Sequence, residues 1–423
     1  MNQAIKVFKF GGASLRDSEN IKNVAAILQK FSSENLFIVV SAMGKTTNAL
    51  ELIVSSYFEQ DGKALGILND IRQKHEVIMA ELFDDTDDVY AQVNDTFVEI
   101  EWILEDEPHD AYDYIYDQIV SVGELLSSKI VAAYLTTIGL NTTWLDARDV
   151  LKTDETWRES VVDWQATAAN AQNLVKPLFT EGSKFVLTQG FIGSTKDNNT
   201  TTLGREGSDY SASIFSHCLD AEAMYIWKDV PGVLSGDPRI FKNMVKLDKI
   251  SYEEAVEMTY YGATVVHPRT IQPLMVKNIP LNVRSFLDHD AAGTVISAEA
   301  PPQYPPILMA ERNQIFLKIS NKDFTFLVES HIRDLFEIFT NYHIFVNLMQ
   351  NSGAYFFISM THAPDREREL MRDLRAKFEI EEHPNCDLFT ARHPTPEIQA
   401  TLKEGKRVFF EKTIPDTYQV LVG

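Results

Sequence analysis

The first forty residues restrict the fold of this chain more than any other stretch. Residues 5–10, IKVFKF, are rich in β-forming types and end at the pair Gly11-Gly12. Apolar residues then recur at helical spacing over residues 18–30, and residues 36–40, LFIVV, are uniformly apolar. An uninterrupted apolar strand is typical of a parallel sheet that is covered on both faces. Strand, glycine turn, helix and strand together predict a βαβ unit.

The composition fits an ordinary folded chain of two or three domains. Of 423 residues, 44% are hydrophobic and 24% are charged. The net charge of −22 argues against nucleic acid or an acidic membrane as a partner, because their phosphates would be repelled. Cys218 and Cys386 offer no disulfide framework, and we find no signal-peptide layout and no apolar run long enough to span a bilayer. We therefore expect a cytoplasmic protein.

The glycine pair after the first strand lies where open α/β sheets bind ligands, at the carboxyl ends of strands. Lys9 precedes this turn and can reach back over it toward a phosphate, although a lone strand lysine is often just solvated. Residues 41–47, SAMGKTT, follow the second strand. A P-loop needs another glycine five positions before Gly44, where Val39 stands, so that reading is rejected. Ser41 and Thr47 remain candidate ligand contacts.

A second glycine turn, residues 200–210, reads TTTLGREGSDY and leads into a predicted helix. The N–H groups at such a helix start favour an anion, and Arg205 can grip a carboxylate in two places. Ser208 or Asp209 is a natural N-cap, and Asp209 could also hold an ammonium group. The turn suits a small zwitterion or a phosphate, but a capped helix with a solvated arginine explains the same residues equally well.

Residues 81–117 contain no lysine or arginine, while acidic residues recur throughout. We interpret this run as the solvated face of helices, because it lacks the spacing of a calcium loop. Glu124 follows in the first turn of the next predicted helix. It either complements the helix dipole or meets the amine of a small substrate.

Four prolines in residues 301–306 predict a linker, and a second domain follows it. The pattern over residues 315–382 reads β, α, β, β, α, β, which is the order of a ferredoxin-like fold. We expect an α/β catalytic domain over residues 1–298, a linker over 299–306 and a regulatory region over 307–423.

The motifs in this order resemble those of the aspartate kinases of the amino acid kinase superfamily. The matching segments are KFGGAS at 9–14, SAMGKTTN at 41–48, GEL at 123–125, QGFIG at 189–193, TTLGREGSDY at 201–210, DVPG at 229–232 and DPR at 237–239. The resemblance implies the amino acid kinase fold, a central and mostly parallel sheet sandwiched by helices. The C-terminal region resembles ACT domains, with one full βαββαβ unit and part of a second.

The resemblance implies an ATP-dependent aspartate kinase that makes 4-phospho-L-aspartate, in the first step of lysine, threonine and methionine biosynthesis. It also implies Mg²⁺ bound with the nucleotide, no metal site among the chain's own side chains, and a homodimer formed through the ACT region. The implied catalytic residues are Lys9, Arg205 and Asp209. The implied aspartate contacts are Ser41, Thr47, Glu124, Arg205, Ser208 and Asp209. The implied nucleotide contacts are Lys9, Gly11, Gly12, Ser14, Lys228, Asp229, Gly232, Asp237, Arg239 and Thr264.

Several positions depart from the family pattern. Ala13 replaces a threonine and Glu206 replaces a glycine, which affects local loop detail. Thr264 stands where the family usually has a lysine aimed at the ATP phosphates, and Lys228 stands where threonine is common. We hypothesise that Lys228 supplies the missing charge. Asn347 replaces a regulatory aspartate, so we expect weak or absent inhibition by lysine.

Two alternatives stay open. A related amino acid kinase, such as a glutamate kinase, would use the same fold, but Arg205, Glu124 and the ACT-type region favour aspartate. A catalytically weak or inactive amino-acid sensor on a kinase scaffold is the second alternative, kept open by Thr264 and Glu206.

Overall fold

The structure, a computed structural model, describes residues 4–85, 87–263, 266–301, 303–323 and 325–423. The chain forms two compact units. The first contains Met1–Val233, Lys246–Val256 and Val265–Pro301, and the second contains Leu234–Val245, Glu257–Thr264 and Pro302–Gly423. Thr264, for which we expected a nucleotide contact, lies outside the described residues.

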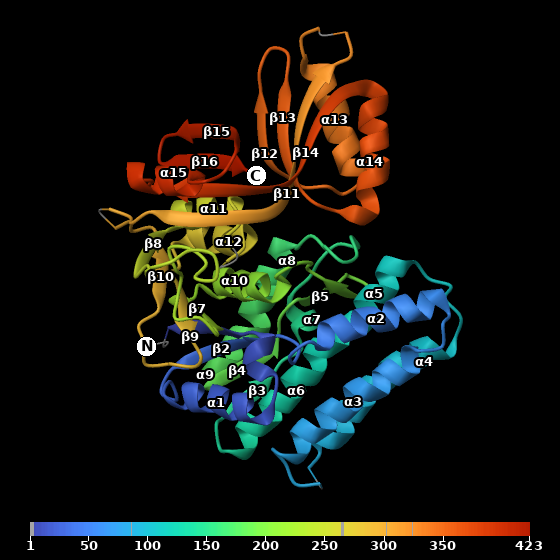
Figure 1. Ribbon diagram of the computed structural model, residues 1–423. Coiled ribbons are helices and arrows are strands. Elements are labelled where there is room, and N and C mark those ends of the chain that lie inside the picture. The colour runs from blue at the N-terminus through green and yellow to red at the C-terminus, as the bar shows by residue number, and fades with distance from the viewer. Residues whose placement is uncertain (1–3, 86, 264–265, 302, 324) are drawn as a thin grey trace. The chain divides into compact units, whose positions relative to one another are not determined.

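The predicted βαβ unit forms the centre of an eight-stranded sheet in the first unit (Figure 1). β1 (Ile5–Phe10) lies between β2 (Asn35–Val40) and β7 (Ala223–Lys228) and is parallel to both. The strand order is β3-β4-β2-β1-β7-β9-β10-β8, and among the described pairings of this sheet only that of β9 with β10 is antiparallel. The other strands are β3 (Thr142–Trp144), β4 (Phe185–Gln189), β8 (Lys249–Ser251), β9 (Leu281–Ser285) and β10 (Thr294–Ser297). The carboxyl ends of β4, β2, β1 and β7 therefore meet at one edge.

Helices cover both faces of this sheet. α10 (Gly207–Leu219) packs on β1, β2 and β7, and α6 (Val122–Thr137) packs against β2, β3 and β4. Side chains alternate between faces along a strand, which separates the two helices. Phe37 of β2 meets Phe215 of α10 with ring centroids 4.7 Å apart, whereas Gln189 of β4 donates a hydrogen bond to α6.

The predicted helical stretch after β2 is three helices rather than one: α2 (Thr46–Glu59), α3 (Ala64–Ala80) and α4 (Val89–Glu105). The first break falls at Gln60 and Gly62, whose φ angles of 54° and 76° leave the helical region. The predicted turn near residue 197 joins a hairpin of β5 (Ile192–Ser194) and β6 (Thr200–Thr202). The remaining helices of this part of the chain are α1 (Ser18–Gln29), α5 (Tyr112–Val120), α7 (Ala147–Val150), α8 (Trp164–Asn170), α9 (Lys176–Thr180), α11 (Tyr252–Tyr260) and α12 (Pro268–Lys277).

The segment Tyr112–Thr137 corrects our expectation that no run is apolar enough to span a bilayer, because its length and composition pass that test. It forms α5 and α6, and 78% of its most apolar window is buried inside the structure. Asp117 and Glu124 lie on this segment and are buried as well. The apolar character reflects packing against the sheet, since a helix that is apolar all round belongs in a core.

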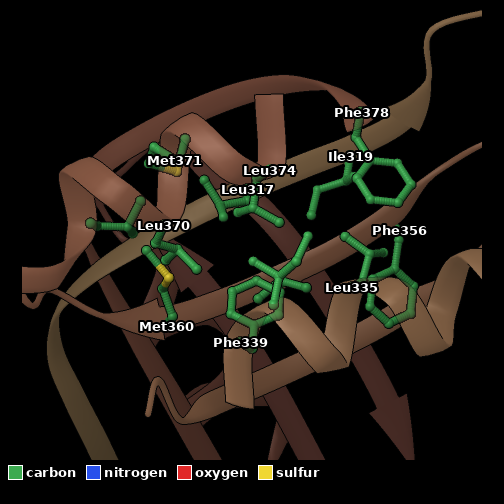
Figure 2. Close-up of a cluster of buried hydrophobic side chains, with 13 residues drawn as sticks. Leu317, Ile319, Leu335, Phe339, Phe356, Met360, Leu370, Met371, Leu374 and Phe378 are labelled. Atoms are coloured by element: carbon green, nitrogen blue, oxygen red, sulfur yellow. The ribbon is translucent and has the colours of Figure 1, made fainter. Parts of the chain in front are cut away.

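The C-terminal module has the predicted order of elements and a ferredoxin-like strand order, β12-β13-β11-β14. The elements are β11 (Ile307–Asn321), α13 (Glu329–Asn341), β12 (Val346–Asn351), β13 (Phe356–Thr361), α14 (Pro364–Lys377) and β14 (Phe378–Arg392). Figure 2 shows their core, where Leu317 of β11, Leu335 of α13 and Leu374 of α14 interdigitate, each fully buried.

The second half of β14 continues the same sheet beyond this module. β14 pairs with β16 (Thr417–Val422), which pairs with β15 (Val408–Ile414). α15 (Pro396–Lys403) packs on this extension through Leu402, which joins the cluster that contains Tyr418. The strands β11 and β14 are longer than predicted, because each serves both parts of one sheet.

Candidate active site

The two predicted glycine turns are brought together by an ion pair at the carboxyl edge of the sheet. Lys9, near the end of β1, places its Nζ 2.6 Å from Oδ1 of Asp209 in the first turn of α10. Lys228, the last residue of β7, places its Nζ 3.6 Å from Oδ2 of the same carboxylate. β1 and β7 are parallel neighbours, so both lysines emerge at the same edge. The side chain of Asp209 is 5% exposed and that of Lys9 is 10% exposed.

This cluster has an excess of positive charge around one buried acid. Burial alone would raise the pKa of Asp209, but attraction to Lys9 and Lys228 outweighs burial and holds that pKa below its ordinary value. Asp209 is therefore a carboxylate that orients two ammonium groups. The sequence had suggested that Asp209 meets a substrate ammonium, and in the structure its oxygens face two lysines of the chain.

The glycine turn after β1 lies beneath the Lys9 side chain and packs closely against the loop after β2. A Cβ on Gly11 would lie 3.4 Å from Nζ of Lys9, so the lysine reaches back over the turn as expected. A Cβ on Gly12 would lie 2.8 Å from the carbonyl oxygens of Ala42 and Gly44, and the Gly44 N–H donates to the Gly12 carbonyl at 3.0 Å. Glycine is required here because the loops after β1 and β2 touch through their backbones.

Glu124, in the first turn of α6, reaches the same edge and is fully buried apart from 3% of its surface. Its Oε1 accepts a hydrogen bond of 3.2 Å from the N–H of Ala42, while its Oε2 is buried without a hydrogen-bond partner among the described residues. Burial raises the pKa of Glu124 to about 8, although the Ala42 bond and the charge of Lys9 act in the opposite direction. An ammonium group brought to Oε2 would satisfy this oxygen and ionise the carboxyl.

The turn between β6 and α10 carries Arg205 on its exposed side. Gly204 has a φ of 74°, and a Cβ on Gly207 would lie 2.6 Å from the ring of Phe191, so both glycines are sterically required. Glu206 has a φ of 56°, a left-handed conformation that favours glycine. The backbone is therefore strained at this position, where the family pattern has a glycine. Among the described residues, Arg205 makes no side-chain hydrogen bond or ion pair, which leaves its guanidinium free for a ligand.

The hydroxyl residues predicted as ligand contacts lie on the loops around this edge. Ser41 follows β2, and its N–H donates to the Phe10 carbonyl at 3.1 Å. Thr47 is half-buried in the first turn of α2, and Ser14 is buried just after the glycine pair. Ser208 is 9% exposed, and a Cβ on Gly190 would lie 2.6 Å from the Cβ of Ser208, so the loop after β4 abuts the start of α10.

The residues predicted to line the nucleotide pocket are divided between the two units. Asp229 is exposed just after β7. Gly232 has a φ of 142° and packs against Thr294, whose hydroxyl accepts a 2.8 Å hydrogen bond from the N–H of Val233. Asp237 and Arg239 belong to the second unit, where they form an ion pair of 2.7 Å. The predicted nucleotide role of these residues stays a prediction.

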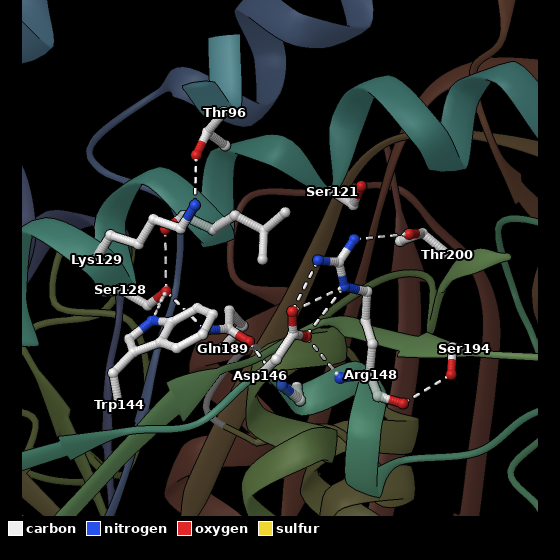
Figure 3. Close-up of polar contacts among 12 residues, drawn as sticks. Thr96, Ser121, Ser128, Lys129, Trp144, Asp146, Arg148, Gln189, Ser194 and Thr200 are labelled. Carbon is white, nitrogen blue, oxygen red and sulfur yellow. Dashed lines mark hydrogen bonds and ion pairs between the residues drawn. The ribbon is translucent and has the colours of Figure 1, made fainter. Parts of the chain in front are cut away.

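Sequence reasoning missed two residues that shape this edge. Asp117 was included in a run interpreted as solvent-exposed, but it is fully buried and accepts hydrogen bonds from Thr202. Gln189 fastens the end of β4: its amide donates to Ser128 at 2.7 Å and accepts from the N–H of Ala147 at 2.7 Å (Figure 3). The apolar character of residues 112–137 was the available signal that acids within it are buried.

The arrangement can bind anions and a zwitterion. Two lysines and a glycine turn suit phosphate groups. The Oε2 atom of Glu124 and the guanidinium of Arg205, neither with a hydrogen-bond partner in the described part of the chain, suit an amino acid. No group of three His, Cys, Asp or Glu side chains among the described residues could hold a metal ion.

Comparison with known protein families agrees with a site for phosphate groups and an amino acid. Residues 4–285 match the model of the amino acid kinase family. The chain is 31% identical over 351 residues to lysine-sensitive aspartokinase 3 of Escherichia coli, with 82% of this chain and 76% of that protein covered. It is 38% identical over 295 residues to bifunctional aspartokinase/homoserine dehydrogenase 1 of Arabidopsis thaliana, covering 69% of this chain and 32% of that protein. The chain thus spans about a third of the length of the bifunctional relatives it matches.

The solved structure of E. coli aspartokinase III in complex with lysine and aspartate superposes with a TM-score of 0.85 at 28% identity, covering 99% of this chain and 96% of the other. The same enzyme in complex with aspartate and ADP gives a TM-score of 0.82 at 27% identity, again covering 99% and 96%. The fold and the charged edge of the sheet define a phosphoryl-transfer scaffold. The chain belongs to the amino acid kinase family and, within it, to the aspartokinases.

Proposed function

We propose that this protein is an aspartate kinase, which transfers the γ-phosphoryl group of ATP to the side-chain carboxylate of L-aspartate. The observation that carries this proposal is the buried cluster of Lys9, Asp209 and Lys228 beside the Gly11-Gly12 turn. The E. coli aspartokinase III structures, described with aspartate and with ADP, support the same substrates here.

Phosphoryl transfer requires that the protein stabilise the charge of the transferring group, and it requires little covalent catalysis by the protein. The bond between the γ-phosphorus and its bridging oxygen breaks, the electron pair leaves with ADP, and a carboxylate oxygen of aspartate forms the new bond. Lys9 and Lys228, held by Asp209, supply two ammonium groups to the oxygens of the group in transit. The fixed geometry matters because these charges need no reorganisation during the step.

Aspartate is oriented by groups of opposite charge. Arg205 binds its α-carboxylate in a forked contact, and Oε2 of Glu124 accepts from its ammonium group. Ser41, Thr47 and Ser208 lie on the surrounding loops and add hydroxyl donors. This polarity leaves the side-chain carboxylate of aspartate pointing toward the two lysines.

ATP is held by the glycine turns and the segment after β7, and Mg²⁺ bound with the nucleotide would neutralise part of the phosphate charge. The residues proposed for this role are Lys9, Gly11, Gly12, Ser14, Lys228, Asp229, Gly232, Asp237, Arg239 and Thr264. We further propose a cytoplasmic homodimer that serves lysine, threonine and methionine biosynthesis, with weak or absent inhibition by lysine.

A hydroxamate assay with ATP, Mg²⁺ and either aspartate or glutamate tests the proposal, because hydroxylamine traps an acyl phosphate. We expect product with aspartate and little with glutamate. Product only with glutamate would indicate a sibling amino acid kinase. No product with either acid, from a chain that still binds aspartate in calorimetry, would indicate an amino-acid sensor.

A further inference from the structure

We infer that Asp117 positions the turn that carries Arg205, an inference that rests on the function proposed above. Asp117 lies in α5, outside the motifs that define the family resemblance, and its side chain is fully buried. Its partners are hydrogen-bond donors from two other segments of the first unit.

Both oxygens of this carboxylate are in use. The Thr202 hydroxyl donates to Oδ1 at 2.6 Å, and the Thr202 N–H donates to Oδ2 at 3.0 Å. The N–H of Arg158 lies 3.1 Å from each oxygen. Burial raises the pKa of Asp117 to about 6, while these bonds pull the pKa down. A carboxylate can accept from all three donors at once, which a hydroxyl cannot match.

The two segments that Asp117 holds meet at the residue before Arg205. Thr202 ends β6, and Gly204 follows two residues later. The carbonyl oxygen of Arg158 lies 3.1 Å from the position that a Cβ on Gly204 would take. Asp117 therefore holds the strand end that leads into Gly204 and the Arg158 segment that packs against Gly204, and with them the point from which Arg205 projects.

Other side chains hold the first two residues of β6, and the hydroxyl groups of Thr153 and Thr201 share a hydrogen bond of 2.8 Å. Arg148, paired with Asp146, donates to the Thr200 hydroxyl at 3.2 Å, as Figure 3 shows. Gln118 donates to the Thr200 carbonyl at 2.9 Å. Loss of Asp117 would thus remove the side-chain anchor of Thr202 and loosen the turn that follows. The turn would stay attached by backbone bonds from the Ser160 N–H to the Thr202 carbonyl at 3.0 Å and from the Leu203 N–H to the Phe191 carbonyl at 2.9 Å.

The principal test compares Asp117→Ala with Asp117→Asn in steady-state kinetics. Alanine removes every acceptor, and we expect the KM for aspartate to rise at least about tenfold, with kcat and the KM for ATP within about threefold. Asparagine should restore the aspartate KM to within about threefold, since its oxygen accepts from the two N–H groups and its NH₂ donates to the Thr202 hydroxyl. The double variant Asp117→Asn with Thr202→Val should lose this rescue.

Asp113→Asn is the matched control. Asp113 lies one turn earlier on α5, is exposed, and pairs with the Arg158 guanidinium at 3.1 Å. Its replacement removes a charge near the same segment but no hydrogen bond to Thr202, so the KM for aspartate should not change. If Asp117→Ala does not fold, Thr202→Val alone should raise the aspartate KM about threefold to fivefold.

A second readout is independent of catalysis. Trypsin cleavage after the exposed Arg205, followed by mass spectrometry, should accelerate at least about fivefold in Asp117→Ala and not in Asp113→Asn. An unchanged aspartate KM in an active variant, or unchanged cleavage at Arg205, would overturn the inference. Accelerated cleavage in a chain without aspartate kinase activity would uphold the positioning role and reject the proposed function.

Discussion

The carboxyl edge of the parallel sheet and the core of the C-terminal module bury side chains of opposite character. The edge buries the ion pair of Lys9 and Asp209 and the carboxyl group of Glu124, although charged and polar groups are costly to remove from water. The module buries leucine, isoleucine and phenylalanine and keeps pairs such as Lys318 and Glu381 at its exposed surface. The difference indicates that the first region is arranged for a charged ligand and the second for stability.

The largest effect is expected from Lys9→Met, which removes an ammonium group from the transferring phosphoryl group and leaves Asp209 with Lys228 at 3.6 Å. We expect kcat/KM to fall at least about a thousandfold, roughly 4 kcal/mol. Lys6→Met on the same strand is the control, because Lys6 pairs with Glu34. A loss below about tenfold in the hydroxamate assay would remove Lys9 from the catalytic set.

In the apolar region, Leu317→Ala should lower the free energy of unfolding by about 3 kcal/mol, because it opens a cavity in a fully buried cluster. Urea denaturation measures this change. Met349→Ala on β12 is the control, since Met349 is 50% exposed and should cost less than about 0.5 kcal/mol. Equal costs for both variants would contradict the contrast between core and surface.

Lys228→Ala tests whether the second lysine carries catalytic charge. Single-turnover kinetics should show phosphoryl transfer slowed about thirtyfold, roughly 2 kcal/mol, because the second ammonium group is lost. Lys249→Ala, an exposed lysine paired with Glu299 at 3.3 Å, should leave the rate unchanged. A mild effect of Lys228→Ala would refute the idea that it replaces the family's missing lysine.

The pH dependence of stability tests the burial of Glu124. Its pKa is raised from 4.5 to about 8, so the folded chain binds more protons than the unfolded chain inside this window. Stability should therefore fall as pH rises, by roughly 2 kcal/mol from about pH 5 to 7 for this group alone. Glu124→Gln should remove that part of the slope in urea denaturation at several pH values. Parallel profiles for both proteins would show that Glu124 is solvated.

The strands and motifs of the first region were predictable because they are local patterns. The β-forming residue types at 5–10 and the apolar run at 36–40 predicted β1 and β2, and the glycine turns marked the edge of the sheet. The error on Asp117 has a physical cause. An acid is usually exposed, and only the packing of α5 against β6 shows that this one is buried among donors.

The chain's sequence by itself determined which residue types lie at the ends of the strands, because strand, turn and helix propensities act over a few neighbouring residues. Only the tertiary structure decided that Lys9 and Lys228 share Asp209 and that, within the described ranges, one oxygen of Glu124 has no hydrogen-bond partner. These relations join residues far apart in the chain, and their electrostatic consequences depend on how much water is excluded around each charge.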